Sequence, residues 1–370
     1  MSSKITGITE LTDTQLDNLV LASGEPEYRA RQLRGWVYQA LAADFREMTN
    51  LPLAFRQELE KVTRLHTLKM THQAAGQDGT IKTLFALADG NSIEAALMVY
   101  PQDGGRQRHT ACLSTQAGCA IGCPFCATGQ QGFKRNLTRG AIIDQALYFA
   151  RHLKNQPDAG NKASSLANIV FMGMGEPLAN YDTLWQAIEA LNSPNGFGLG
   201  ARNMTVSTAG LVPQIKRLSR EKLQVGLAVS LHAGDNALRD RLVPINRKYP
   251  LEELIPACRE YYRSTGRRVS FEYVLFKGIN DSAARARALA RLLQGLNCHV
   301  NLIPANLTSD RAFQPPPAQV ILAFERELRQ SHVNATLRQP RGQDICAGCG
   351  QLRSRLTKDA AGLKNTLIKV

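Results

Sequence analysis

The sequence GCAIGCPFC, at Gly118–Cys126, is the most informative stretch of the chain. Three cysteines, Cys119, Cys123 and Cys126, follow the spacing CxxxCxxC. The glycine and proline between them suit a tight loop that turns the three sulfur atoms inward, because glycine tolerates unusual backbone angles and proline fixes its own. Thiolates are the usual protein ligands of iron–sulfur clusters. Three cysteines on a 4Fe-4S cluster leave one iron open to a small molecule, as a catalytic centre requires.

The spacing, with Phe125 directly before the last cysteine, resembles the signature of radical S-adenosylmethionine (SAM) enzymes. In that family the open iron binds the amino and carboxylate groups of SAM. The alternative is a structural zinc site, since zinc prefers four ligands, commonly two CxxC pairs. Cys346 and Cys349 form such a pair, and the last two cysteines of the loop form another. Because this alternative leaves the first loop cysteine without a role, the spacing favours the cluster.

Composition indicates a globular protein with a polyanionic partner. The chain has 370 residues, enough for one large domain and a smaller appendage. Lys and Arg number 45 against 31 Asp and Glu, a net charge of +14, so nucleic acid is the expected partner. No apolar run is long enough for a membrane span, and the first residues lack the apolar core of a signal peptide. We therefore expect a cytoplasmic protein with no membrane partner, in which clustered cysteines serve a metal or catalysis.

Residues 1–75 are predicted to form a helical accessory domain that binds RNA. Thr12 is a suitable N-cap for a first helix, and Pro26 and Pro52 are placed to open a second and a third. The second helix carries three arginines, at Arg29, Arg31 and Arg34. These arginines either form its solvated face or contact phosphate.

Residues 76–106 are predicted to form a β-hairpin that links this domain to the catalytic core. Two runs with strand-like alternation flank Asp89-Gly90. An Asp-Gly pair between two such runs is a strong hairpin signal.

Residues 107–345 are predicted to form an α/β core, in which short apolar runs alternate with helical stretches. The runs lie at 110–114, 168–172, 204–208, 225–231, 269–275, 300–304 and 333–337. Strands separated by helices indicate parallel β/α units, and six or seven of them fit a barrel or a partial (β/α) barrel. The active site of such a barrel gathers at the carboxyl ends of its strands.

Polar residues follow several of these predicted strands. In FMGMGEPL, at 171–178, the glycines allow a ligand close to the backbone, and Glu176 can accept from an ammonium group. Gly175 and Glu176 are therefore candidates to bind the amino group of SAM. Further candidates are Ser207, Ser230, Leu231, His232 and Asn306. Each alone is as easily a capping or loop residue, but at the ends of successive barrel strands they would line one pocket.

Over nearly its whole length the chain resembles the radical SAM methyltransferases that methylate C2 of adenosine 2503 in 23S ribosomal RNA. The matching stretches are YRARQL (28–33), QAGCAIGCPFC (116–126), QQGF (130–133), MGMGEPLANY (172–181), SLH (230–232), PINR (244–247), GINDS (278–282) and RGQDICAGCGQL (341–352). Some members also methylate adenosine 37 of certain tRNAs. A sister group methylates C8 of the same rRNA adenosine and carries Gly-Glu-Ala where this chain has Gly-Glu-Pro, so C2 is the preferred reading.

The resemblance implies two catalytic cysteines outside the loop and two SAM molecules per turnover. Cys349 matches the residue that accepts a methyl group from a first SAM. A second SAM, bound at the cluster, is cleaved to a 5′-deoxyadenosyl radical, which takes a hydrogen from the S-methyl group, and the carbon radical adds to C2. Cys112 matches the thiol that releases the adduct by forming a disulfide with Cys349. Glu94 matches the proposed acceptor of the C2 proton, with Cys112 as its rival.

Other implications of the resemblance concern the partners and the C-terminal segment 346–370. The implied partners are protein-poor or naked 23S rRNA, tRNA and a low-potential electron donor such as flavodoxin or ferredoxin. Cys346 departs from the family pattern, and it either competes for Cys349 as a disulfide partner or has no role. Cys112 is otherwise a buried packing residue. A zinc-stabilised RNA-binding protein without catalysis is the alternative from another functional class.

Overall fold

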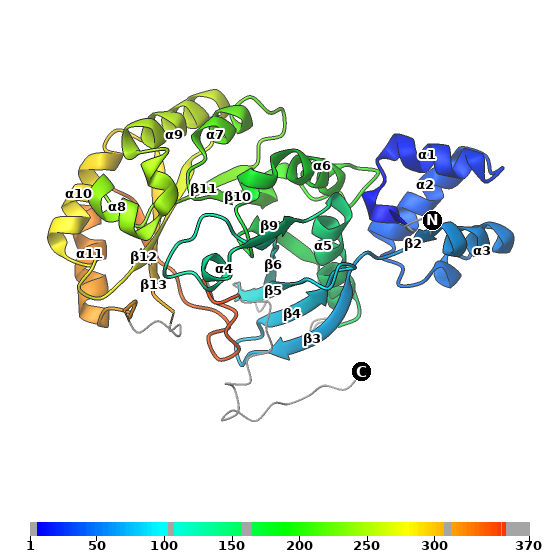
Figure 1. Ribbon diagram of the computed structural model, residues 1–370, viewed down its shortest axis with the longest axis horizontal. Coiled ribbons are helices and arrows are strands. Elements are labelled where there is room, and N and C mark those ends of the chain that lie inside the picture. Colours follow the sequence, from blue (N-terminus) through cyan, green and yellow to red (C-terminus); the bar gives the residue numbers. More distant parts are fainter. Residues whose placement is uncertain (1–5, 103–106, 157–164, 307–311, 349, 353–370) are drawn as a thin grey trace.

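Figure 1 shows the computed structural model of the chain, which describes residues 6–102, 107–156, 165–306, 312–348 and 350–352. Its helices are α1 (Asp13–Ala22), α2 (Tyr28–Arg34), α3 (Leu53–Val62), α4 (Ala127–Gln130), α5 (Arg139–Lys154), α6 (Tyr181–Asn192), α7 (Val212–Leu218), α8 (Asn236–Leu242), α9 (Leu251–Thr265), α10 (Ala283–Leu293) and α11 (Ala318–Gln330). Its strands are β1 (Thr6–Gly7), β2 (Thr63–Arg64), β3 (Lys69–Ala75), β4 (Ile81–Ala86), β5 (Ser92–Pro101), β6 (Gln107–Cys112), β7 (Gln116–Gly118), β8 (Phe133–Asn136), β9 (Leu166–Phe171), β10 (Met204–Thr208), β11 (Gly226–Ser230), β12 (Val269–Leu275), β13 (Cys298–Pro304) and β14 (Ala335–Leu337).

A single mixed sheet forms the centre of the molecule, with strands in the order β14-β13-β12-β11-β10-β9-β6-β5-β4-β3. From β6 to β14 all neighbours are parallel, whereas β3, β4, β5 and β6 pair antiparallel. Helices connect successive parallel strands and cover the outside of the sheet (Figure 1). This is the predicted α/β partial barrel, because each of the seven predicted core runs overlaps an observed parallel strand.

Apolar side chains fill the core on the helix side of the parallel strands. Val206, Phe271 and Val300 are fully buried there. Strands that are covered on both faces need such nearly continuous apolar runs, which is why the runs were visible in the sequence. No helix in the described ranges is both long and apolar enough to cross a membrane.

The predicted hairpin forms at Asp89-Gly90, but it does not act as a separate link between domains. Its strands β4 and β5 are internal strands of the large sheet, and β3, which falls inside the predicted helical domain, extends the same sheet. The reason lies in β5, where Ala95 and Ala96 are both fully covered although they face opposite sides. A strand buried on both faces belongs to a core. The predicted boundaries at residues 75 and 106 therefore do not follow the sheet.

The N-terminal helices begin close to where their capping signals predict. Thr12 accepts the backbone N–H of Gln15, whose side chain accepts the backbone N–H of Thr12, a reciprocal capping box. Helix α3 starts directly after Pro52, whereas α2 starts two residues after Pro26 and continues into a π-helical turn, η2 (Gly35–Gln39). These helices therefore begin where fixed proline angles or satisfied N–H groups favour a first turn.

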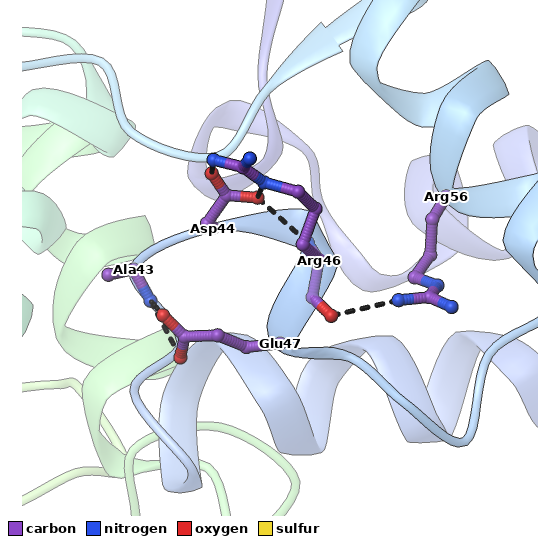
Figure 2. Close-up of polar contacts among 5 residues, drawn as sticks. All are labelled: Ala43, Asp44, Arg46, Glu47 and Arg56. Carbon is purple, nitrogen blue, oxygen red and sulfur yellow. Dashed lines mark hydrogen bonds and ion pairs between the residues drawn. The ribbon is translucent and has the colours of Figure 1, made fainter.

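Figure 2 shows the turn that leads from η2 toward α3. Asp44 accepts hydrogen bonds from the backbone and the guanidinium group of Arg46, and the Glu47 carboxylate accepts the Ala43 N–H at 3.3 Å. Arg56 of α3 donates to the backbone oxygen of Arg46 at 2.8 Å. The Arg46 guanidinium lowers the pKa of Asp44 to about 2. Local charge pairs thus fix this exposed turn.

Helix α5 holds the N-terminal helices against the sheet. Arg139 donates to the backbone oxygens of Thr9 and Leu11, at 2.5 and 2.8 Å. At the other end of α5, Arg151 donates to the backbone oxygen of Leu41 at 2.9 Å, and Lys154 bonds the backbone nearby. Buried apolar residues continue from these helices into the barrel as one cluster. The helical part and the barrel therefore share a core.

Candidate active site

A cavity at the carboxyl ends of the parallel strands gathers most of the candidate residues. Ten of them line it: Cys112, Cys119, Cys123, Cys126, Gly175, Glu176, Ser207, Ser230, His232 and Asn306. Two more, Leu231 and Glu94, are buried and do not line it. Cys349 lies outside the described residues, but its neighbours Gly348 and Gly350 line the same cavity.

The cysteine loop is closed by backbone contacts at both ends. Strands β7 and β8 pair antiparallel around it, and the N–H of Cys119 donates to the Gly132 oxygen at 3.2 Å. Within the loop, the N–H of Cys126 donates to the Cys123 oxygen at 3.1 Å, and Gly122 takes a left-handed φ of 72°. That φ explains the glycine, because a side chain would be strained there. The loop thus brings three thiols to one wall of the cavity.

The donor set fits a 4Fe-4S cluster. Burial raises the pKa of Cys119 to about 12 and the pKa of Cys123 well above its usual range, with the neighbouring thiols adding to both shifts. Buried thiolates that repel each other need a strongly positive ligand, and a metal centre provides one. Among the described residues, no three His, Cys, Asp or Glu side chains are grouped to hold a single metal ion. Cysteines that ligate different irons of one cluster do not need such a grouping.

The GMGEP loop after β9 buries one carboxylate next to the cluster loop. Glu176 accepts the N–H of Leu178 at 3.0 Å and the N–H of Ala209 at 2.7 Å. Full burial nevertheless raises its pKa to about 7. Gly175 has φ of 102°, and a Cβ there would lie 2.5 Å from the Gln116 side chain. Glycine is therefore required for the loop to pack closely and to present Glu176 to the cavity.

The strand-end candidates are held mainly by backbone contacts. Ser207 donates to the Phe171 oxygen at 2.6 Å, and His232 accepts the N–H of Val274 through Nδ1 at 3.0 Å. Burial, with a smaller contribution from Arg239, lowers the pKa of His232 to about 3, so the ring is neutral. A neutral ring that accepts through Nδ1 carries its proton on Nε2. His232 can therefore donate one hydrogen bond.

No sequence pattern indicated Arg239, which organises two strand ends. This fully buried side chain donates to the backbone oxygens of Ala209, Ser230 and Leu231 at 2.6 to 3.2 Å, and to Asn246 at 2.7 Å. Burial lowers its pKa to about 10. A buried arginine is stable only when its donors are satisfied in this way. Its role is to hold the ends of β10 and β11 in place.

Cys112, Glu94 and Lys82 share the cavity face of the sheet. Cys112 is paired with Ala96 of β5 on one side, and Lys82 of β4 is paired with Ala96 on the other. Side chains on one strand alternate between faces, so Glu94 and Met98 point to the same side as Ala96, and Met98 lines the cavity. The Lys82 ammonium lies 3.5 Å from the Glu94 carboxylate, and both side chains are largely buried.

The C-terminal segment rests on the turn that follows the cysteine loop. The N–H of Ala127 donates to the Gly350 oxygen, and the Thr128 hydroxyl donates to the Leu352 oxygen, each at 2.8 Å. A Cβ on Gly348 would lie 2.6 Å from the Asn306 amide, so glycine permits this close approach. Cys346 is exposed and does not line the cavity, although its backbone oxygen accepts from Lys82 at 3.3 Å.

All cysteines in the described part of the chain are free thiols. The disulfide that involves Cys349 falls outside those residues and stays a prediction. Of the alternative zinc set, Cys123 and Cys126 line the cavity and Cys346 does not, so these three thiols are not gathered at one place.

Sequence reasoning did not select several polar residues that line the cavity. Glu272 accepts from Asn301 at 2.7 Å and lies 3.5 Å from Arg338. Tyr100 and Arg341 lie on the cavity wall as well. The one signal for Glu272 was a carboxylate in the middle of the apolar run VSFEYVL. Tyr100, Arg338 and Arg341 lie at the ends of strands or beyond them, where the position of the chain depends on the register of the sheet.

Comparison with known proteins identifies the family. The family model of the Radical SAM superfamily matches residues 113–289, and that of the ribosomal RNA large subunit methyltransferase N-terminal domain matches residues 6–65. A protein of Moorella thermoacetica named "Probable dual-specificity RNA methyltransferase RlmN" is 48% identical over 344 residues, which cover 93% of this chain and 96% of that protein. The chain belongs to the RlmN family.

Two further proteins match over almost their whole length. One, from Nitrosopumilus maritimus and named "Ribosomal RNA large subunit methyltransferase N", is 43% identical over 95% of this chain and 99% of its own. The crystal structure of a radical SAM methyltransferase from Sphaerobacter thermophilus is 49% identical, superposes with a TM-score of 0.90 and covers 95% of this chain. RlmN proteins are radical SAM enzymes, which use a 4Fe-4S cluster and SAM. These matches favour neither the C8 alternative nor a non-catalytic zinc protein.

Proposed function

We propose that this RlmN-family methyltransferase transfers a methyl group to C2 of adenosine 2503 in 23S rRNA and of adenosine 37 in tRNA, through a methylated Cys349. One observation carries the proposal. Cys112 and both neighbours of Cys349 line the cavity that also holds the three loop thiols. A cysteine that carries the methyl group, a second that releases the product and a cluster site are all required in one place by this chemistry.

The cofactor residues have separate tasks. Cys119, Cys123 and Cys126 would hold the cluster, and Gly175, Glu176, Ser207, Ser230, Leu231, His232 and Asn306 would hold SAM. When bound, the cluster and SAM supply the radical that removes a hydrogen atom from the S-methyl group of Cys349. The Glu176 carboxylate, buried among backbone N–H groups, suits an ammonium group because a counter-charge removes the penalty of its burial.

The remaining residues handle the RNA adduct. Once the methylene carbon of Cys349 is bonded to C2, a base must take the C2 proton. Cys112 lines the cavity, and Glu94 is its diagonal neighbour on the same sheet face, about 7–8 Å away, so both are candidates for this step. The unpaired electron of the adduct would pass to the bound cluster. The Cys112 thiolate then attacks Sγ of Cys349, the carbon–sulfur bond breaks with its electron pair on the methylene carbon, and a Cys112–Cys349 disulfide remains. A proton on that carbon completes the methyl group.

The partners follow from the same proposal. Adenosine 2503 must reach a cavity at the carboxyl ends of the strands, so we infer that the substrate is protein-poor or naked 23S rRNA. The names of the RlmN relatives, with their dual specificity, support tRNA as a second substrate. Return of the enzyme to its starting state needs a low-potential electron donor, such as flavodoxin or ferredoxin, in the cytoplasm.

Replacement of Cys112 is the sharpest test. Cys112→Ala should leave the RNA covalently attached to Cys349, since no thiolate remains to break the carbon–sulfur bond. Mass spectrometry of nuclease-treated protein should find a nucleotide on the peptide that contains Cys349. The matched control is Cys258→Ala, because Cys258 is a fully buried thiol of α9 away from the cavity. Normal turnover by Cys112→Ala, or methylated rRNA that carries the group on C8, would contradict the proposal.

A further inference from the structure

Two arginine side chains each lie near the ring of Tyr100, which lines the cavity. The guanidinium carbon of Arg108 lies 5.0 Å from the centroid of the Tyr100 ring, and that of Arg341 lies 5.3 Å from it. Tyr100 and Arg108 are directly paired across β5 and β6, so the sheet itself places them together. Arg341 arrives from the segment that follows β14. Both Tyr100 and Arg341 line the cavity that holds Cys112.

The positive charge at this place is only weakly compensated. Arg108 is exposed and forms no ion pair with a carboxylate of the described chain. For Arg341 the carboxylate contact is Asp78 Oδ2 at 3.9 Å, and that same oxygen already accepts the N–H of Gly342 at 2.9 Å. Nε of Arg341 is buried and has no hydrogen-bond partner among the described residues. A buried donor of a charged group without a partner is unfavourable, so the described residues do not fully satisfy the Arg341 guanidinium.

Other charged groups of the cavity wall differ in this respect. Arg338 lies 3.5 Å from the buried Glu272 carboxylate, so its charge is compensated within the protein. The buried candidate for the ammonium group of SAM, Glu176, is a carboxyl group and adds no positive charge. Arg341 on this wall and Arg108, which is exposed beside Tyr100 and does not itself line the cavity, are therefore the cations near Tyr100 that are available to an external anion.

We propose that Arg108 and Arg341, held on Tyr100, bind one backbone phosphate of the RNA next to the nucleotide that enters the cavity. Planar guanidinium forks match phosphate oxygens, and the tyrosine ring stabilises both cations by cation–π contact before RNA arrives. The exposure of Arg108 indicates an anion that approaches from solvent, as a macromolecular backbone does. The inference rests on the proposed function, because RNA is the ligand that brings a phosphate to this cavity.

The test compares Arg108→Gln, Arg341→Gln and the double variant with Arg263→Gln. Arg263 is an exposed residue of α9 without an ion pair to a described carboxylate, so its replacement removes the same charge away from the cavity. Binding of protein-free 23S rRNA and of an unrelated single-stranded RNA is measured between low and high salt. SAM binding and the melting temperature are measured on each holoenzyme.

Each single variant should bind both RNAs about tenfold more weakly, since a charge-assisted hydrogen bond is lost. The slope of log K against log salt should become shallower by about one, as expected for one phosphate contact. Because both arginines hold the same phosphate, the double variant should lose less than the product of the two single losses. Arg263→Gln and the SAM affinities should stay at the wild-type level.

Several results would overturn the inference. One is that the arginine variants bind RNA no more weakly than Arg263→Gln does. Another is a double variant whose loss of RNA affinity equals the full product of the two single losses. The third is weaker SAM binding by the arginine variants, which would assign the two cations to the SAM carboxylate. The proposed function fails differently, through wild-type protein that does not methylate 23S rRNA. The phosphate contact is measured by binding alone and on two RNAs, so the two failures can be told apart.

Discussion

At the scale of single residues, Glu94 and Lys82 show how an ion pair stabilises a buried carboxylate. Lys82 lies 3.5 Å from the Glu94 carboxylate and donates to the backbone oxygen of Cys346 at 3.3 Å. A buried carboxylate of this kind needs a partner charge. Lys82 thus links the candidate proton acceptor to the segment that leads to Cys349.

If Glu94 takes the C2 proton, Glu94→Gln should slow release of product about a hundredfold or more, the usual contribution of a general base. Methylation of Cys349 by SAM should continue, because it needs no proton acceptor at C2. Lys82→Met should lower the rate of the same step by a smaller factor. Lys82→Arg should keep most of the wild-type rate, because it keeps the charge. Single-turnover assays that follow methylated RNA and methylated Cys349 separately measure both effects. A normal rate for Glu94→Gln would assign the proton to Cys112.

Residues whose role depends on local spacing could be found from the sequence, and residues whose role depends on register could not. The cysteine loop and the GMGEP loop carry their signal within a few positions. Lys82 and Arg239 act on backbone and side chains of other strands, and one lysine in a strand or one arginine in a helix has no distinctive pattern. The chain must be folded before such partners are known.

At the scale of elements, α5 is the junction between the N-terminal helices and the barrel. Asp144 on α5 accepts from the backbone N–H of Thr67 at 2.5 Å and from its hydroxyl at 2.6 Å. Burial raises the pKa of Asp144 to about 6, although these hydrogen bonds oppose the shift. The folded chain therefore holds the Asp144 proton more tightly than the unfolded chain does, and ionisation of this group destabilises the fold.

This shift predicts a pH dependence of stability. For an acid whose pKa is raised by folding, the stabilisation is present at low pH and is lost as pH rises through the folded pKa of about 6. Asp144→Asn should remove that loss, so its stability relative to wild type should improve between pH 5 and pH 7 by about 1 kcal/mol. Denaturant unfolding at both pH values measures the difference. Equal pH dependence in the two proteins would contradict the assignment.

A second group at the same junction titrates in the opposite sense. Burial, with Arg151 nearby, lowers the pKa of His66 to about 4. Its contribution to stability is present above the usual histidine pKa and is lost as pH falls toward 4. Because His66 is unchanged in Asp144→Asn, the comparison between variant and wild type isolates the carboxylate.

The boundaries of the elements also could be predicted only where they depend on local sequence. Strand existence was predictable from apolar runs, and the hairpin from Asp-Gly. Membership of β3, β4 and β5 in the barrel sheet was not, because alternating runs look alike in an isolated hairpin and at the edge of a larger sheet. Only the pairing of β5 with β6 distinguishes the two.

At the scale of the whole molecule, the shared core predicts cooperative unfolding. Buried apolar residues continue from α1 and α3 through the sheet to α11, and Arg139 and Arg151 add backbone contacts across the junction. A part that shares its core with the rest does not melt alone. Calorimetry of the holoenzyme should therefore show one transition, and Arg139→Gln should lower its midpoint by a few degrees. Two well-separated transitions would show that the helical part is an independent unit.

Net charge and fold class are also properties of the whole molecule, and both could be predicted from the sequence. The charge of +14 indicated a polyanion without locating its contact. The location comes from the fold, which brings Arg341 from beyond β14 to a tyrosine of β5. Such a meeting joins parts of the chain more than two hundred residues apart, and no local pattern records it.

The two-residue alternation of β5 has a practical consequence for anyone who alters the length of this chain. Met98 and Tyr100 line the cavity and Glu94 points to the same side of the sheet, whereas Ile93, Ala95 and Leu97 face the helix-side core. Deletion or insertion of one amino acid inside β5 would exchange these two sets, which places a carboxylate in the apolar layer and apolar side chains against the substrate. Homologues and designed variants can therefore vary in length at the Asp89-Gly90 turn or beyond Pro101, and between those points the count is fixed.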